Sequence, residues 1–195
     1  MDIDTKRVSD IQEQNLHSLL RQACRLRLFS SLKIDSGVET EELENPNDFL
    51  YGQWMSVILM SGQALQCTLK MHYFNESALA LSCHSLGLPS KKIKPGMITD
   101  YMRELTNLFA GEIKSQLFSN EILVGISLPL ITRGFDEILF SDNLGKFIVR
   151  DYWKFCWNSH EIVLTSETEV FQPEILNSVT IKEFNIEDEG EIDFL

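Results

Sequence analysis

The sequence predicts an α+β fold in which a mixed, largely antiparallel sheet is packed with long helices. Residues 9–32 and 98–119 carry apolar side chains at the three- and four-residue spacing of amphipathic helices. Residues 65–74 alternate apolar and polar side chains, and residues 147–157 are rich in aromatic side chains, as is typical of strands. The order of helix, strands, helix, long helix and further strands fits a sheet with helices packed on it.

The composition is that of a globular protein with an acidic surface. The chain has 195 residues, of which 44% are hydrophobic and 24% charged, with a net charge of -12 and a pI of about 4.7. This charge argues against binding to nucleic acid or to an anionic membrane, since both partners require a basic surface. The N-terminal residues are polar and no apolar run could cross a bilayer, so we expect a cytoplasmic protein.

The cysteines and histidines do not indicate a metal site. The four cysteines are widely separated and the four histidines stand singly, without a C-x-x-C pair or an H-E-x-x-H motif. The sequence also contains no Walker A loop, no G-x-G-x-x-G and no G-x-S-x-G. We therefore expect no metal and no cofactor held by this chain.

The first predicted element is the helix over residues 9–32, with Ser9 or Asp10 as a candidate N-cap. Its arginines, such as Arg21 and Arg25, lie toward the C-terminal half, where positive charge suits the helix dipole. An acidic connection follows over residues 35–48, with a short strand near Val38. We treat residues 1–48 as an N-terminal helix with its connection, ahead of a main domain over residues 49–171.

The main domain begins with strands at residues 49–60 and 65–74, joined by a turn at residues 61–63. A short helix over residues 75–86 follows, for which Asn75 or Ser77 is the candidate N-cap and Gly87 the stop. After the long helix, residues 122–130 form a buried strand that carries Pro129. Because proline lacks an N–H donor, this residue should lie at the strand end or on a sheet edge.

The C-terminal part of the main domain is predicted to be strand-rich. Residues 135–140 form a short strand, and residues 147–157 and 162–169 form a hairpin across residues 158–160. From residue 172 onward the apolar pattern is weak, and the end of the chain is acidic. We treat residues 172–195 as an acidic C-terminal tail, and we expect its end to be loosely attached or disordered unless Phe194 and Leu195 dock on something.

The long helix at 98–119 has two stripes, with Thr99 or Asp100 as its candidate cap. Its apolar stripe consists of Ile98, Met102, Leu105, Phe109, Ile113 and Leu117. A second stripe lies about half a turn away at roughly 100° per residue, and it consists of Asp100, Glu104, Asn107, Gly111 and Lys114. One face of the helix therefore packs on a core, and the other presents polar groups.

Glu104 and Asn107 are the candidate functional pair of that stripe. They stand at i and i+3 and so project from one face. A carboxamide is a poor acid or base, but it can donate and accept at once and so hold a water molecule in a chosen orientation. A carboxylate one turn away offers a charge-assisted contact to a partner's lysine or arginine. Spacing alone favours an ordinary solvated helix face for this pair.

The wider pattern resembles the motif of the CheC/CheX/FliY family of chemotaxis phosphatases. The pattern is Asp100-x-x-x-Glu104-x-x-Asn107, followed by Gly111 on the helix and Pro129 on the next strand. The segment ELTNLFAGEIKSQL is most similar to the CheX branch, and the resemblance spans roughly residues 49–169. It implies a CheC-like α/β sandwich.

The resemblance also implies a function, the hydrolysis of the aspartyl phosphate on a CheY-like response regulator. Glu104 would pair with a lysine of the regulator, and Asn107 would enter the regulator's active site and orient the attacking water. The other partner-binding positions would be Asp100, Gly111, Lys114 and Pro129. The Mg²⁺ would belong to the regulator, and the single-site CheX branch implies a homodimer.

Two features depart from the family pattern. Between Asn107 and Pro129 lie 129 − 107 − 1 = 21 residues, one fewer than the family pattern has. Only one copy of the motif is present, which favours the single-site CheX type over the two-site CheC type.

The alternatives to the phosphatase function are a non-catalytic module of the same fold that binds a response regulator or the flagellar switch, and an unrelated small-molecule enzyme. The second is disfavoured because no nucleophile or general base stands out.

Overall fold

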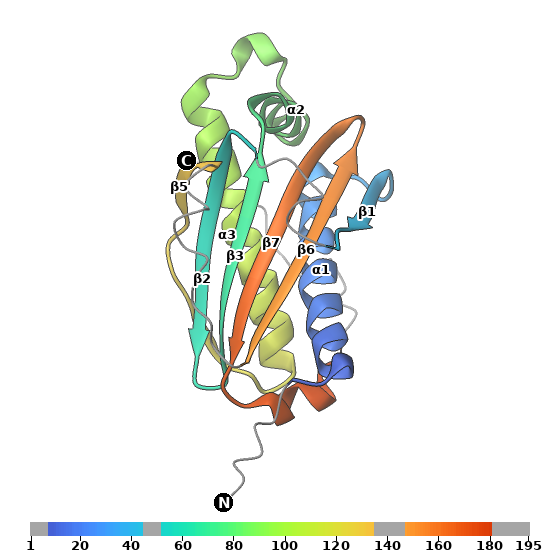
Figure 1. The fold of residues 1–195 in the computed structure, drawn as a ribbon. Coiled ribbons are helices and arrows are strands. Elements are labelled where there is room, and N and C mark those ends of the chain that lie inside the picture. The colour runs from blue at the N-terminus through green and yellow to red at the C-terminus, as the bar shows by residue number, and fades with distance from the viewer. Residues whose placement is uncertain (1–7, 45–51, 135–146, 181–195) are drawn as a thin grey trace, which may run out of the picture.

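One antiparallel sheet organises the structure, a computed structural model that describes residues 8–44, 52–134 and 147–180. Its strands run in the order β1-β6-β7-β3-β2, and both β4 and β5 pair with the outer side of β2 (Figure 1). All pairings in the described part are antiparallel. The strands are β1 Val38–Glu42, β2 Trp54–Gly62, β3 Leu65–Tyr73, β4 Val124–Ile126, β5 Leu130–Arg133, β6 Ile148–Trp157 and β7 His160–Val170.

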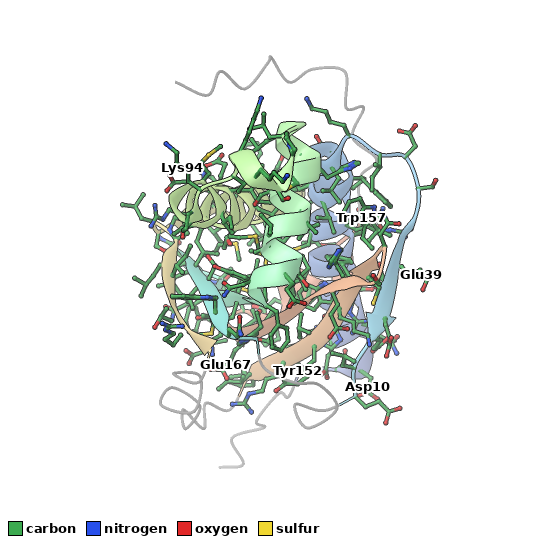
Figure 2. All side chains as sticks on the ribbon, turned by 90° about the horizontal axis from the view of Figure 1, so that it is seen from above. Asp10, Glu39, Lys94, Tyr152, Trp157 and Glu167 are labelled. Carbon is green, nitrogen blue, oxygen red and sulfur yellow. The ribbon has the colours of Figure 1, made fainter. Side chains whose placement is uncertain are left out.

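Two long helices lie side by side on one face of the sheet, and a third crosses its end (Figure 1). Seen from above, α1 and α3 are viewed almost along their axes, while Tyr152 and Glu167 lie on the sheet side away from the helices (Figure 2). The helices are α1 Asp10–Leu32, α2 Asn75–Leu86 and α3 Pro95–Ser119, with short 3-10 segments η1 Ser90–Lys92 and η3 Pro173–Ser178. The predicted α+β fold with a largely antiparallel sheet is confirmed.

The hydrophobic core fills the space between the sheet and the helix layer. On β3, Cys67, Leu69 and Met71 are buried toward the helices, while the residues between them are half-exposed. This alternation is the period of two that the sequence showed. Leu19 and Leu20 of α1 lie in the same core as these strand residues.

A local signal explains where α1 begins. The Ser9 hydroxyl accepts from the backbone N–H of Gln12, and the Gln12 side chain accepts in return from the Ser9 N–H. This reciprocal capping satisfies two N–H groups that a helix start leaves free. The helix predicted at 9–32, with Ser9 as its cap, is confirmed.

The predicted caps of the other two helices are wrong. At α2 the N-cap position is Phe74, and no side chain caps it, although Gly87 ends the helix with φ +63° as expected. At α3 the helix begins at Pro95, three residues before the predicted start. Proline suits that first turn because its N–H would have no partner there anyway. Thr99 is inside the helix, where its hydroxyl donates to the Pro95 carbonyl.

The hairpins differ slightly from the prediction. β2 extends through Gly62, which pairs with Val124, so the β2–β3 turn is Gln63-Ala64 rather than residues 61–63. A Cβ on Gly62 would lie 2.1 Å from the Leu123 carbonyl oxygen, which explains the glycine. The β6–β7 hairpin is confirmed and turns at Asn158 and Ser159, both with positive φ.

The buried strand predicted at 122–130 is wrong in two respects: it is interrupted, and it lies on the sheet edge with Leu123, Leu128 and Leu130 exposed. Met60 of β2 pairs with Ile126, and Val57 pairs with Leu130. From Val57 to Met60 the β2 strand advances by three residues, while the edge segment from Ile126 to Leu130 advances by four. One extra residue is therefore inserted in the edge segment, which forms a β-bulge. Pro129 lies within this bulge, on the sheet edge. Its predicted position at a strand end or edge is confirmed.

The first part of the predicted tail is packed. The Gln12 side-chain amide donates to the Pro173 carbonyl and to Asn177 Oδ1, both at 2.8 Å. Leu176 of η3 is fully buried, and the Asn120 side chain bonds the backbone of Thr180. The first part of the predicted tail, residues 172–180, is therefore attached to the rest of the fold. Residues 181–195, and the predicted strand at 135–140, lie outside the described residues.

Candidate functional site

The helix α3 faces the core with the predicted apolar stripe. Met102, Leu105, Phe109, Ile113 and Leu117 are buried. The structure thus fixes which face of α3 points away from the sheet.

The predicted polar stripe lies on that outward face. Asp100, Asn107, Gly111 and Lys114 are exposed, and Glu104 is half-buried. A Cβ placed on Gly111 would meet nothing within 4 Å, so the surface one turn after Asn107 is open. The amide is therefore accessible from outside, with a carboxylate one turn before it and free space one turn after it.

Arg103 also lies on this face, although the sequence analysis did not single it out. Its Nη1 lies 3.3 Å from Asp100 Oδ1, and the two side chains are 48% and 76% exposed. The helical spacing of four between Arg103 and Asn107 was available from the sequence. The candidate face thus holds two cations, Arg103 and Lys114, and two carboxylates, Asp100 and Glu104, along with the amide.

A buried polar contact holds α3 against β2 directly behind this face. The Thr106 hydroxyl lies 2.8 Å from Ser56 Oγ and 2.8 Å from the Met102 carbonyl oxygen. Both hydroxyl-bearing residues are fully buried. Because a hydroxyl has one proton and a carbonyl oxygen can only accept, the Thr106 hydroxyl donates to the Met102 carbonyl and accepts from the Ser56 hydroxyl. This contact limits the rotation of α3 and so fixes the direction in which Asn107 points.

Pro129 lies on the sheet edge that α3 packs against. Ile131, two residues after it, pairs with Ser56, which in turn contacts Thr106 of α3. The bulge therefore lies beside the middle of α3. Its neighbours Leu128 and Leu130 are 91% and 64% exposed, so the bulge is an apolar projection at the edge of the candidate face.

Charged residues of α1 form a second polar cluster, which is structural. Arg21 contacts both carboxylate oxygens of the buried Asp151 on β6 and both of Glu42 at the end of β1. Near the α3 side, Arg27 Nη2 lies 2.9 Å from the buried Glu112. The prediction that the arginines serve the helix dipole misses these partners, which come from distant segments.

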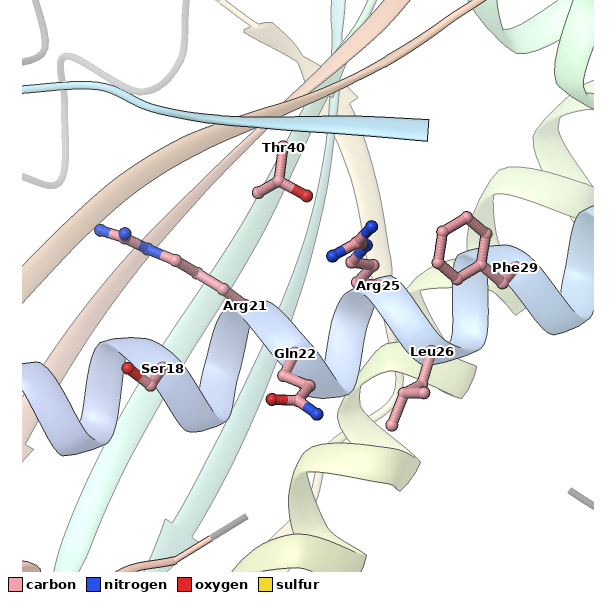
Figure 3. A pocket seen from close by; sticks show the side chains of 7 residues that line it. All are labelled: Ser18, Arg21, Gln22, Arg25, Leu26, Phe29 and Thr40. Carbon is pink, nitrogen blue, oxygen red and sulfur yellow. The ribbon is translucent and has the colours of Figure 1, made fainter. Parts of the chain in front are cut away.

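A cavity of about 340 Å³ lies between α1 and β1. Figure 3 shows Arg25, Phe29 and Thr40 in this space, with Arg25 5.1 Å above the Phe29 ring. It lies away from the polar stripe of α3. The donors of Arg21 that line it already bind carboxylates, so the cavity is a poor candidate for an anionic ligand.

The described residues contain no group of three or more histidine, cysteine or acidic side chains placed to hold a metal ion. Burial raises the pKa of the Cys67 thiol to about 11, and it also raises the pKa of Cys24, so these two thiols stay protonated at neutral pH. Among the helices of the described part, none is long and apolar enough to cross a bilayer.

Comparison with known proteins gives no match at the level of sequence. Neither a family model nor a curated protein matches the chain. Solved structures do match. A CheC-like superfamily protein from Shewanella sp. PV-4 superposes with a TM-score of 0.61 at 15% identity, covering 80% of this chain and 97% of that one. The chain has the CheC/CheX fold. The resemblance inferred from the motif is thereby confirmed for the fold.

Two other structures extend the comparison of the CheC/CheX fold. CheX from the CheX–CheY–BeF₃–Mg²⁺ complex of Borrelia burgdorferi has a TM-score of 0.60 at 15% identity, with 77% of this chain and 94% of that one covered. The FliM middle domain of H. pylori has a TM-score of 0.56 at 11% identity, with 87% and 99% covered. The fold therefore occurs both in a CheX that binds CheY and in FliM.

Proposed function

We propose that this protein is a phosphatase for the aspartyl phosphate of a CheY-like response regulator. The observation that carries the proposal is the exposed Asn107, presented with Glu104 and Arg103 on the outward face of α3. A face of this kind offers an orienting amide and charges on an exposed helix surface. It suits chemistry in which the reacting bond belongs to a partner.

In the proposed reaction, Asn107 enters the regulator's active site and orients one water molecule toward the phosphorus atom. The water oxygen forms a bond to phosphorus, and the bond between phosphorus and the aspartyl oxygen breaks. The aspartyl carboxylate leaves with the electron pair, and both protons of the water end on inorganic phosphate, as H₂PO₄⁻. Positioning and charge stabilisation supply most of the acceleration in such phosphoryl transfers.

The remaining groups have roles in docking. Glu104 forms an ion pair with a lysine of the regulator, and Asp100, Gly111, Lys114 and Pro129 lie in the contact surface. The Mg²⁺ that neutralises phosphoryl charge belongs to the regulator. The Borrelia CheX structure supports this assignment by analogy, since it contains CheY, Mg²⁺ and beryllofluoride. We further propose that the protein acts in the cytoplasm as a homodimer.

The test is phosphate release from a phosphorylated CheY-like receiver. Asn107→Ala should slow the release by about 2–4 kcal/mol, roughly 30- to 1000-fold, because the amide acts only in the transition state. Its urea unfolding curve should match the wild-type curve, since exposed substitutions change stability by about 0.5 kcal/mol or less. Full activity of Asn107→Ala would contradict the proposed mechanism.

A second candidate function is a non-catalytic module that binds a response regulator or a flagellar partner. The similarity to the FliM domain favours it. Binding and hydrolysis are separated by measuring receiver affinity alongside phosphate release. Glu104→Lys should weaken binding through repulsion of the regulator's lysine under either function. Receiver binding without any hydrolysis by the wild type would favour the binding module.

A further inference from the structure

Arg103 stands beside Asn107 in a position from which it can reach a group held by the amide. At about 100° per residue, Arg103 is offset about 40° to one side of Asn107 and Glu104 about 60° to the other. Both precede it by one turn. The amide is therefore flanked by a cation on one side and an anion on the other.

Packing contacts show which flank is which. Glu104 lies toward α1, on the side where Tyr101 lies 3.0 Å from the Ser31 hydroxyl. Arg103 lies toward the sheet. On that side of α3 the Thr106 hydroxyl lies 2.8 Å from Ser56 Oγ of β2, and the positive charge of Arg103 works against the rise that burial causes in the pKa of Tyr73 on β3. The two charges thus face different parts of any partner that covers Asn107.

The guanidinium of Arg103 is available for a new contact. Its ion pair with Asp100 is a single 3.3 Å contact between two exposed side chains. Such exposed pairs contribute about 0–1 kcal/mol. Arg103 can therefore leave Asp100 and bind a stronger anion of a partner protein at little cost in free energy. Arginine carries five donors in a planar fork that matches phosphoryl oxygens. By contrast, Arg21 of α1 already binds two carboxylates.

We propose that Arg103 is a second catalytic residue, whose guanidinium binds a phosphoryl oxygen of the partner's aspartyl phosphate. This inference rests on the proposed function, since it places the phosphoryl group beside Asn107. Glu104 then selects the partner through its lysine, and Arg103 selects the phosphorylated form. As the bond from phosphorus to the leaving carboxylate breaks, Arg103 stabilises charge on the oxygens that stay with phosphorus. An arginine supplied from a second protein acts in this way in other phosphoryl transfers.

The experiment measures two quantities for the wild type, Arg103→Ala, Arg103→Lys and Asn107→Ala. The first is the rate of phosphate release from a phosphorylated CheY-like receiver. The second is the affinity for that receiver with and without beryllofluoride and Mg²⁺, which mimic the acyl phosphate. Arg103→Ala should lower kcat tenfold to a hundredfold and abolish the preference for the beryllofluoride form. Arg103→Lys should recover part of both, and Asn107→Ala should lose turnover but keep the preference.

Arg150→Gln is the matched control. Arg150 is a 39% exposed arginine paired with Glu167 at 2.9 Å, but it lies on the opposite face of the sheet. It should leave rate and preference unchanged. If Arg103→Ala keeps both wild-type values while Asn107→Ala is inactive, the role of Arg103 is refuted and the proposed function stands.

Two further outcomes separate the inference from the function. In the first, the wild type binds the beryllofluoride form of the receiver more tightly but does not hydrolyse the aspartyl phosphate, and Arg103→Ala loses that preference. This result would support Arg103 as the phosphoryl-binding residue and refute the phosphatase activity. If the wild type neither hydrolyses nor binds the phosphorylated receiver, the proposed function and the role of Arg103 are both refuted.

Discussion

The helices α1 and α3 differ in what their charged residues contact. The two are similar in length, 23 and 25 residues, and lie side by side on the same sheet face. On α1, Arg21 and Arg27 bind the buried carboxylates of Asp151 and Glu112. On the outward face of α3, an ion pair joins Asp100 to Arg103, and both side chains are exposed.

This difference separates structural charges from candidate functional ones. A buried carboxylate must have a partner, since an unpaired charge in the interior costs several kcal/mol. Arg21 and Arg27 therefore stabilise the fold by pairing with buried carboxylates. Asn107 and Arg103 are not required in this way, because water already forms hydrogen bonds with an exposed amide or guanidinium. Residues of the second kind are free to serve a partner, and mutation should affect the two helices in different measurements.

The largest expected effect is a loss of folding stability when the ion pair between Arg21 of α1 and Asp151 is broken. Arg21→Met removes the guanidinium partner of the buried Asp151 and leaves its 3.8 Å contact with His17 Nδ1, and it should lower the free energy of unfolding by about 3–5 kcal/mol. Urea unfolding followed by circular dichroism measures it. The double variant Arg21→Met/Asp151→Leu should recover much of the loss, because it removes both charges together. A loss below 1 kcal/mol in the single variant would mean that the pair is not structural.

The next effect concerns the anchor of α3. Thr106→Val keeps the side-chain shape but leaves the buried Ser56 hydroxyl without its contact. The loss should be about 1–3 kcal/mol in urea unfolding. Thr106→Ser keeps the hydroxyl and should recover the part of the loss that comes from the hydrogen bond. Equal losses in Thr106→Val and Thr106→Ser would assign the effect to packing instead.

The smallest effect is the pH dependence of the α1 cluster. The hydrogen bond from Arg21 lowers the pKa of Glu42 below its ordinary value of 4.5. A lowered pKa gives stability that is present above pH 4.5 and lost as the pH falls through the folded-state pKa. Because Glu42 is 66% exposed, the contribution should be at most about 1 kcal/mol. The stability difference between the wild type and Glu42→Gln should therefore shrink between pH 7 and pH 3.5, and growth of that difference would contradict the assignment.

Periodic patterns made α3 predictable. Its apolar residues recur every three or four positions, so the buried and exposed faces follow from the sequence, as does the placement of Glu104 and Asn107 on the outward side. Its start was missed because Pro95 and Gly96 are typical of loops as well as of a first helical turn. The alternation in β3 and the Asn158-Ser159 turn were equally local signals.

What the sequence could not supply depends on contacts between distant segments. The bulge at Pro129 is defined by the register of β2, some seventy positions earlier in the chain. The packing of residues 172–180 depends on the Gln12 side chain at the other end of the protein. The pairing of Arg21 with Asp151 joins positions 130 apart. None of these has a local pattern, so only the fold reveals them.

The bulge at Pro129 also affects how the sheet ends. An open edge strand is a template on which other chains can add strands and aggregate, and bulges and prolines interrupt that template. Here the edge offers three regular residues in β4 and four in β5, with an N–H missing at Pro129 between them. A foreign strand would find no longer run of regular backbone along this edge. The extra residue thus protects this edge of the sheet against edge-to-edge aggregation.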